Sequence, residues 1–316
     1  PAWFLYEVTI ANLTSMTDDR STGLKRWFLV AAPVLTIAAI VPVFAVSPSE
    51  RLVSVGSGIS ALLCFFSFCA YLFQGDPIGP SRRVTAAWDE VRASPFRRFL
   101  GPGVIRSAVL VLASGVGSLV IVAGASAFMM RTSLTQDRLS ALVFFGYALG
   151  FFVFLVGFGA YLRSRTTTAM VSRVLLFTIL FAIAAGPWIF AVIADLITDG
   201  TSHNAYAIAA PSPFYVFMMI DAIEHARGDL LVYVGLVAIA IWACLGLLFL
   251  LLAQRRCAKI IAAHEAMLAE TDRILAAEDE AEIGAAAKRA AEPAAAVAEA
   301  QVVGDFAPPE APAGGA

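Results

Sequence analysis

The chain has 316 residues, of which 59% are hydrophobic and 15% charged, and its mean hydropathy is +0.80. Soluble domains have about 25% charged residues, so this composition excludes an ordinary soluble globular protein. The net charge of −2 gives no support for a nucleic-acid partner. Apolar runs of about 20 residues, the length that crosses a bilayer, recur along the chain. The sequence therefore predicts an all-α, polytopic membrane protein.

Residues 1–26 read as an interfacial N-terminal segment rather than a cleaved signal peptide. The opening "PAWFLYEVTIANL" is rich in Trp, Phe and Leu, and a polar stretch follows it before the first long apolar run. Because the small-residue pattern of a cleavage site is missing, we expect this segment to form a short helix at the membrane surface.

Hydropathy predicts six transmembrane helices within residues 27–253. Gly and Pro inside these runs do not argue against helices in a membrane, where both residues are tolerated. Small residues in the third run, such as Gly115 and Gly124, permit close approach of a neighbouring helix. The expected spans are 27–46, 53–74, 104–128, 140–162, 174–197 and 230–253.

The basic residues predict the orientation of these spans. With a cytoplasmic N-terminus, 18 of the 22 Lys and Arg residues fall on the cytoplasmic side, and the other four are Arg51, Arg131, Arg138 and Arg227. Positive residues are retained on the cytoplasmic side of membranes. We therefore expect both termini to be cytoplasmic.

A mixed-charge segment, residues 81–99, separates the second and third spans. The stretch from Arg82 to Leu100, "RRVTAAWDEVRASPFRRFL", holds five arginines and two acids. Val84, Trp88 and Val91 recur in it at helical spacing before Pro95 ends or kinks the helix. Such a helix would lie along the inner membrane surface. It is either a positive loop resting on anionic lipid or a docking helix for a cytoplasmic motor.

Two further segments lie outside the expected spans. Residues 205–228 contain "APSPFYVF" and are too short and polar for a span, so we expect a re-entrant or interfacial helix on the outer side. Residues 254–292 are rich in Ala and Glu and should form a cytoplasmic helix. Residues 293–316 are rich in Pro, Ala and Gly, a composition that predicts a disordered tail.

Motifs for chemistry are missing from the chain. It has no phosphate-binding loop, no His-Glu-x-x-His and no Gly-x-Ser-x-Gly, so we expect neither an enzyme nor a bound cofactor. Asp221, Glu224 and His225 share one helix face, which leaves a weak alternative of an outer metal or acid–base site beside the simpler interpretation of a solvated histidine. No ionisable residue falls near the middle of an expected span, where coupled carriers place one. Any energy source should therefore be a separate subunit.

This arrangement resembles the membrane subunit, or permease, of type-2 exporter ATP-binding-cassette transporters. Members of that family have six spans, an N-terminal interfacial helix, a helix after span two that runs into a Ser/Thr-Pro turn, and a Ser-Pro-Phe/Tyr segment between spans five and six. Here "WDEVRASPFRRFL" and "APSPFYVF" occupy the corresponding places, although "RRVTAAWDE" replaces the family's Glu- and Gly-containing approach to the helix.

The resemblance implies a function, partners and site residues. It implies an export permease in a bacterial inner membrane, working as a homodimer or paired permease among membrane lipids with a cytoplasmic ATP-binding subunit. Trp88 is the expected anchor in a groove of that subunit, because large amphipathic residues dominate interfaces. The expected docking residues are Trp88, Asp89, Glu90, Arg92, Ser94 and Pro95, and those of the outer segment are Pro211, Ser212, Pro213, Phe214 and Tyr215.

Two other functions stay open at this point. One is a membrane scaffold or sensor whose cytoplasmic tail recruits a partner. The other is a secondary carrier or channel that works alone, which the uncharged span interiors disfavour.

The predicted topology can be tested with reporter tags. Tags at Arg51, Gln136 and His203 should report the outer side, and tags at Arg92, Arg165 and His264 the inner side, because of the distribution of Lys and Arg. The six-span topology is wrong if Arg92 and His203 report the same side.

Overall fold

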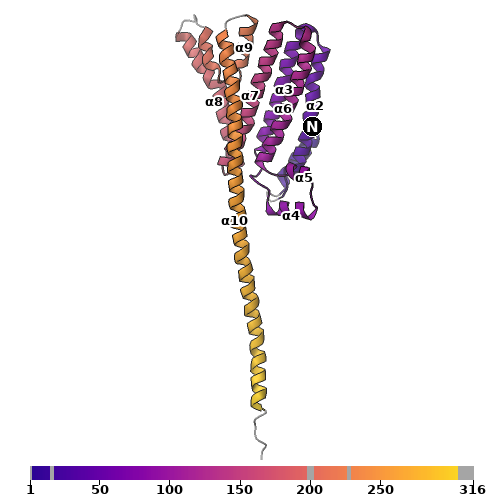
Figure 1. The fold of residues 1–316 in the computed structure, drawn as a ribbon, viewed down its shortest axis with the longest axis vertical. Coiled ribbons are helices and arrows are strands. Elements are labelled where there is room, and N and C mark those ends of the chain that lie inside the picture. The colour runs from indigo at the N-terminus through magenta and orange to yellow at the C-terminus, as the bar shows by residue number, and fades with distance from the viewer. Residues whose placement is uncertain (1, 15–17, 198–202, 226–228, 305–316) are drawn as a thin grey trace, which may run out of the picture. The chain divides into compact units, whose positions relative to one another are not determined.

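The structure is a computed structural model that describes residues 2–14, 18–197, 203–225 and 229–304. It divides into two compact units, Pro1–Ile260 and Ile261–Ala316. The described residues are helical almost throughout and contain no β-strand. In chain order the elements are α1 (Ala2–Leu13), α2 (Thr22–Ala45), η1 (Pro48–Glu50), α3 (Arg51–Phe73), α4 (Arg82–Glu90), α5 (Pro95–Leu100), α6 (Val104–Met129), η2 (Met130–Thr132), α7 (Thr135–Arg165), α8 (Ala169–Ile197), η3 (His203–Ala209), α9 (Tyr215–Glu224) and α10 (Asp229–Gly304) (Figure 1).

Six helices in the described residues are long and apolar enough to cross a membrane, which confirms the predicted polytopic helical fold. They are α2, α3 with η1, α6, α7, α8 and the Leu230–Ala286 part of α10. Several are longer than the apolar runs predict; α7, for example, covers 31 residues rather than 140–162. The reason is that backbone hydrogen bonding continues into polar residues beyond the edge of an apolar run.

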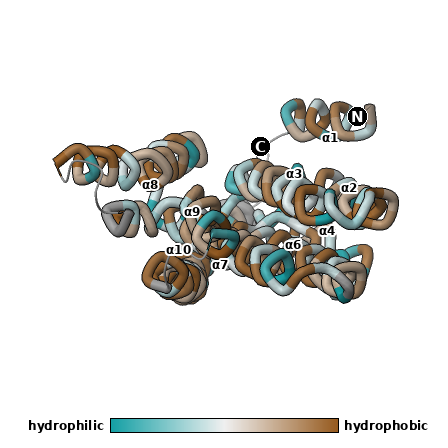
Figure 2. Tube along the Cα trace, turned by 90° about the horizontal axis from the view of Figure 1, so that it is seen from above, coloured by the Kyte–Doolittle hydropathy of each residue, from teal (hydrophilic) through white to brown (hydrophobic). Residues whose placement is uncertain are grey.

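α7 is the central helix of the first unit. Half of the residues in its most apolar stretch are buried, compared with 11% in the corresponding stretch of α8. On one side α7 packs with α3 and α6, on which α2 packs in turn, around Phe28, Phe66 and Phe152. On the other it packs with α8, α9 and α10 around Phe154 and Trp242. The first unit therefore has two groups of helices that share α7, and the view from above shows α8 apart from α2 and α6 (Figure 2).

Small and hydroxyl residues bring the spans together. α7 and α10 cross so closely that a β-carbon at Gly157 would overlap the carbonyl oxygen of Gly246. Between α2 and α6, the hydroxyl of Thr36 donates to Ser118 Oγ at 2.8 Å. Close backbone approach and interhelical hydrogen bonds are the main sources of helix association in lipid, so these contacts fix the order of the bundle.

Helix α1 lies beside α2 and α3, outside the rest of the first unit (Figure 2). Its Phe4 ring packs 4.6 Å from the ring of Trp27 in α2. No residue of α1 is buried, and Leu5, Tyr6 and Leu13 are mostly exposed. An apolar outer surface of this kind fits a helix that lies in the membrane interface.

The bundle has two ends with different structures. α4 and α5 lie at one end, below α2, α3 and α6, and α9 lies at the opposite end (Figure 1). These ends are called the hairpin end and the α9 end from here on.

The second unit consists of the distal part of α10. The helix passes residue 292, its expected end, and continues to Gly304. Alanine-rich sequence has the strongest helix propensity, which here outweighs the disfavoured Pro293 within the helix. The remaining part of the predicted disordered tail, residues 305–316, lies outside the described residues.

The glycine contact between α7 and α10 leads to a stability prediction. Gly157→Ala should lower the stability of the purified chain by about 1–3 kcal/mol, because its β-carbon meets backbone that can yield only by separating the two helices. Thermal unfolding in detergent measures the effect. Gly117→Ala and Gly124→Ala are matched controls, since both glycines face open space. Equal losses at Gly157 and at the controls would contradict the packing of α7 on α10.

Candidate docking hairpin and its buried ion pair

Residues 82–100 form two short helices rather than one continuous helix. Ser81 caps α4 by accepting a hydrogen bond from Val84 N, and Ser94 caps α5 by accepting one from Arg97 N, both at 3.3 Å. Pro95 occupies the first turn of α5, where its missing N–H costs nothing. The predicted Ser94 and Pro95 therefore shape the turn between the helices.

The turn itself is a helix-ending motif built around Arg92. Arg92 has a positive φ of 48°, its N–H donates to Asp89 O at 3.1 Å, and the N–H of Ala93 donates to Trp88 O at 2.8 Å. These two bonds form the Schellman motif, which places the residue after the helix in the left-handed region. The chain is thereby reversed, and α4 and α5 together form a helical hairpin.

Trp88 does not have the position that the sequence suggests for a docking anchor. Trp88 is only 7% exposed, and its indole lies so close to Gly101 that a β-carbon at that position would overlap it. The guanidinium of Arg106 stacks over the ring, with Cζ 5.5 Å from the centroid. Helical periodicity turns Val84 and Trp88 toward the spans, so Trp88 holds the hairpin on the bundle and is not available to a partner.

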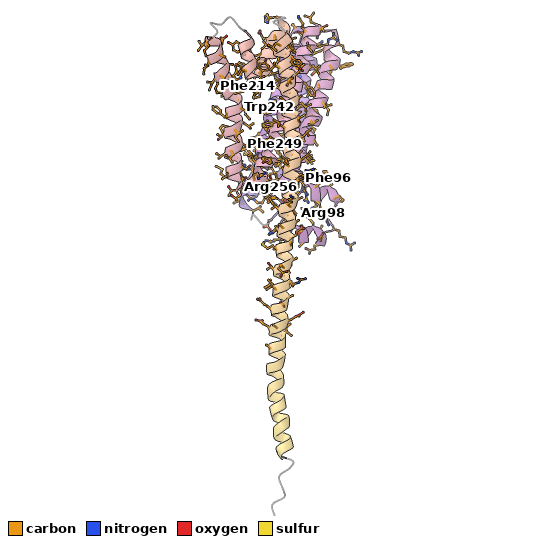
Figure 3. The ribbon with its side chains drawn as sticks, turned by 60° about the vertical axis from the view of Figure 1, so that its left-hand side comes forward. Phe96, Arg98, Phe214, Trp242, Phe249 and Arg256 are labelled. Carbon is orange, nitrogen blue, oxygen red and sulfur yellow. The ribbon has the colours of Figure 1, made fainter. Side chains whose placement is uncertain are left out.

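The exposed residues of the hairpin include a tip formed by Glu90, Val91, Arg92, Phe96 and Arg97. Val91 and Phe96 are 61% and 62% exposed. Beside the tip, Arg98 Nη2 and Asp89 Oδ1 form an exposed ion pair at 2.8 Å. Figure 3 shows Phe96 and Arg98 at the hairpin end, away from Phe214 at the α9 end. The hairpin thus presents two apolar side chains among charges of both signs.

A buried ion pair lies behind the hairpin. Lys25, in the first turn of α2, is fully buried, and its Nζ lies 2.8 Å from Asp76 Oδ2 in the linker between α3 and α4. The same ammonium donates to Gly101 O at 2.7 Å, and Ser107 Oγ of α6 donates to Asp76 Oδ2 at 2.5 Å. A buried charge needs a partner and full hydrogen bonding, and this cluster supplies both.

The ion pair joins the two ends of the hairpin to the spans. Asp76 precedes α4, and Gly101 follows α5, so one ammonium group holds the chain on both sides of the hairpin. The backbone closes the same junction, because Val104 N donates to Pro77 O at 3.0 Å. Movement of the hairpin must therefore displace α2, α3 and α6 or break the pair.

A small cavity lies next to the ion pair, between α3, α6 and α7. Its volume is about 20 Å³, which is enough for one water molecule. Gln74 and Ser107 are the polar residues in its wall, and Gln74 Oε1 has no hydrogen-bond partner among the described residues. The cavity is too small for a transported molecule, so it belongs to the structural polar cluster.

The outer segment named in the sequence is a hydrogen-bonded corner at the α9 end. Ser212 is fully buried; its hydroxyl donates to Ala184 O at 2.8 Å and accepts from Trp188 Nε1 at 2.9 Å. Tyr215 Oη donates to Leu231 O at 3.0 Å. Pro211 and Phe214 are exposed and Pro213 is half-buried. The segment thus joins α8 to α10, and α9 follows it as the short helix expected within 205–228.

The alternative outer metal site is not assembled. His225 Nδ1 lies 3.0 Å from Asp221 Oδ1, one helical turn away. Among the described residues no group of three or more His, Cys, Asp and Glu side chains is placed to hold a metal ion.

The sequence interpretation missed the ion pair. It treated Lys25 only as a positive residue at a membrane edge and did not single out Asp76 or Ser107. The available signal was weak. Lys25 lies in the first turn of the first span, and Asp76 lies between Gly75 and Pro77, just after the end of the second span. Their pairing depends on how α2, α3 and α6 pack, which sequence spacing does not show.

Comparison with known proteins gives no relative of this chain: no family model, no curated protein and no solved structure matches it.

The ion pair can be tested with a double-mutant cycle. Lys25→Met alone leaves the Asp76 carboxylate buried and should cost about 3–5 kcal/mol of unfolding free energy, whereas Lys25→Met with Asp76→Asn should recover most of the loss. Unfolding in detergent measures both. Arg83→Met, which breaks the exposed Arg83–Asp18 pair, should change stability by less than about 1 kcal/mol. A double variant as unstable as Lys25→Met would rule out the coupling.

Proposed function

We propose that the chain is the permease subunit of an ATP-driven exporter in a bacterial inner membrane. In this proposal a separate ATP-hydrolysing subunit docks on the tip of the α4–α5 hairpin. The observation that carries the proposal is the combination of an exposed tip and a buried ion pair. A part that transmits force needs an outward surface for its partner and a stiff connection inward, and the hairpin has both.

The arrangement of the other elements supports the same function. Six candidate spans, the interfacial helix α1, the hairpin between the second and third spans and the buried corner between the fifth and sixth follow the order of the family that the sequence resembles. The distribution of Lys and Arg supports a cytoplasmic location for the hairpin end, where ATP would be available.

The docking surface in this proposal is the tip rather than Trp88. Val91 and Phe96 are the apolar side chains that would be buried in the partner, because exposed apolar groups at the centre of an interface contribute most of its binding energy. Glu90, Arg92 and Arg97 would pair with charges around them.

Contact of the hairpin with anionic lipid accounts for its five arginines but not for its two acids. Asp89 and Glu90 lie on the exposed surface of α4. Acidic side chains are repelled by the negative surface of the cytoplasmic leaflet. A protein partner with charges of both signs accommodates the tip better.

We also expect two permease subunits in the assembly. Only 11% of the residues in the most apolar stretch of α8 are buried within the chain. The exposed surface of this helix could therefore contact a second copy of the chain as well as lipid.

A second candidate function, recruitment of a soluble partner, is favoured by the second unit. Met267 and Ile274 are seven residues apart and more than half exposed, and Leu275, next to Ile274, is 53% exposed. A heptad stripe of apolar residues on an exposed helix is typical of a surface for another helix. In this alternative the tail, and not the hairpin, binds the partner.

Truncation of the two apolar side chains of the tip tests the proposal. Val91→Ala with Phe96→Ala should reduce recovery of a phosphate-loop ATPase from native membranes at least about tenfold, since each buried hot-spot side chain contributes about 2 kcal/mol. Affinity purification with quantitative mass spectrometry is the measurement. Phe128→Ala with Leu134→Ala is the matched control, because these residues are equally exposed at the α9 end.

The same measurement separates the two candidate functions. Deletion of residues 263–316 should leave ATPase recovery unchanged if the hairpin is the docking surface. If that deletion abolishes recovery while the hairpin variant retains it, the chain recruits its partner through α10 and the permease proposal fails.

A further inference from the structure

Three arginines at the hairpin end lie apart from the docking tip, two of them near the ends of α7 and α8 and the third within α10. Arg163 is near the end of α7, Arg173 in the first turns of α8, and Arg256 follows the apolar part of α10. Figure 3 shows Arg256 at the hairpin end, below Phe249 and Trp242 along α10. The set is called the arginine cluster below.

Helix-end carbonyl groups orient the three guanidinium groups. Arg173 donates to Tyr71 O at 3.2 Å and to Leu72 O at 2.8 Å, at the end of α3. Arg256 Nε donates to Ser164 O at 2.9 Å, and Arg163 Nη1 to Thr166 O at 3.2 Å, both at the end of α7. These bonds use few of the five N–H donors that each guanidinium offers, so the cluster is positioned but far from saturated.

The positive charge of the cluster is not balanced within the chain. Among the described residues, none of the three arginines forms an ion pair with a carboxylate. Arg163 interacts electrostatically with Asp76 and is repelled by Arg173, but Asp76 is already paired with Lys25 at 2.8 Å. Arg163 and Arg256 both interact electrostatically with the thiol of Cys257, so both lie near this side chain.

Buried donors without partners give a second, independent indication of a ligand. Arg163 is 8% exposed, and its Nε has no hydrogen-bond partner in the described part of the chain. Ser172 Oγ, one residue before Arg173, is fully buried and equally unpartnered. Buried polar groups in native proteins are almost always paired, so an anion with several acceptor oxygens would satisfy this site.

We propose that the arginine cluster binds the phosphate of an anionic phospholipid in the leaflet at the hairpin end. Guanidinium groups match phosphate oxygens in geometry and charge. Basic pockets between membrane helices bind anionic headgroups in this way. The acyl chains would lie along exposed apolar residues, Phe177 one turn from Arg173 on α8, and Leu252 and Leu248 one and two turns from Arg256 on α10.

A lipid fits the site better than a soluble phosphate. Arg163 and Arg173 stand at the ends of candidate membrane spans, and Arg256 directly follows the apolar part of α10, so all three lie beside exposed apolar surface. A zwitterionic headgroup would bring a positive choline into a field of three positive charges, which is unfavourable. The site should therefore select phosphatidylglycerol over phosphatidylcholine, and this selection does not depend on the ATPase partner.

The test uses the full-length chain purified in detergent, with native mass spectrometry and thermal unfolding in the presence of added lipid. Phosphatidylglycerol should remain bound to the wild-type chain in native mass spectrometry. It should also raise the unfolding temperature of the wild type more than phosphatidylcholine does. The combined variant Arg163→Gln, Arg173→Gln and Arg256→Gln should bind phosphatidylglycerol about a hundredfold more weakly, because each basic residue contributes about fivefold near an anionic surface.

Two further variants keep the test decisive. The control Arg83→Gln, Arg92→Gln and Arg97→Gln removes the same charge from the exposed hairpin and should keep the preference for phosphatidylglycerol. Arg256→Gln alone changes an exposed residue and should weaken lipid binding without loss of folding if the triple variant is unstable.

Two outcomes would overturn the proposal. One is an unchanged preference for phosphatidylglycerol in both the triple variant and Arg256→Gln. The other is equal stabilisation of the wild type by inorganic phosphate or glycerol phosphate, which would mean that the cluster binds a soluble anion.

Discussion

The arrangement of the hairpin end depends on the ion pair between Lys25 and Asp76. One ammonium group meets the linker before α4 through Asp76 and the linker after α5 through Gly101, and the carboxylate also accepts from Ser107 on α6. Such a pair adds little net stability, because desolvation of both charges offsets their attraction. Its effect is geometric: the pair tolerates only the packing of α2, α3 and α6 in which each charge finds its partner.

The hairpin is built with two opposite faces, and this division explains its charge pattern. Val84 and Trp88 turn inward, where Gly101 leaves room for the indole and Arg106 covers it. Val91 and Phe96 turn outward among charged residues. An inward face that fixes the hairpin and an outward face that remains free are what a docking element requires, and a loop resting on lipid would not need the buried charges behind it.

The fold was predictable from the sequence to a much greater extent than the site. Apolar runs of membrane-spanning length determine six helices directly, since every backbone group in lipid must be bonded within its own helix. The residues that hold the hairpin on the bundle were harder to recognise. Trp88 is of a residue type that often anchors protein interfaces, but here it is buried. The reason is that α4 meets the bundle with the face that carries its larger apolar residues. Lys25 and Asp76 are 51 positions apart, and only the packed spans bring them together.

The most direct test of the account is to identify what touches the hairpin tip in native membranes. A photoreactive amino acid at Val91 or Phe96 should crosslink to an ATPase that contains a phosphate-binding loop, and the same group at Leu134 on the α9 end should not. Crosslinking in the absence and presence of a non-hydrolysable ATP analogue would show whether the contact responds to the nucleotide. Crosslinks from the tip to lipid alone, with the same pattern as from Leu134, would contradict the docking function.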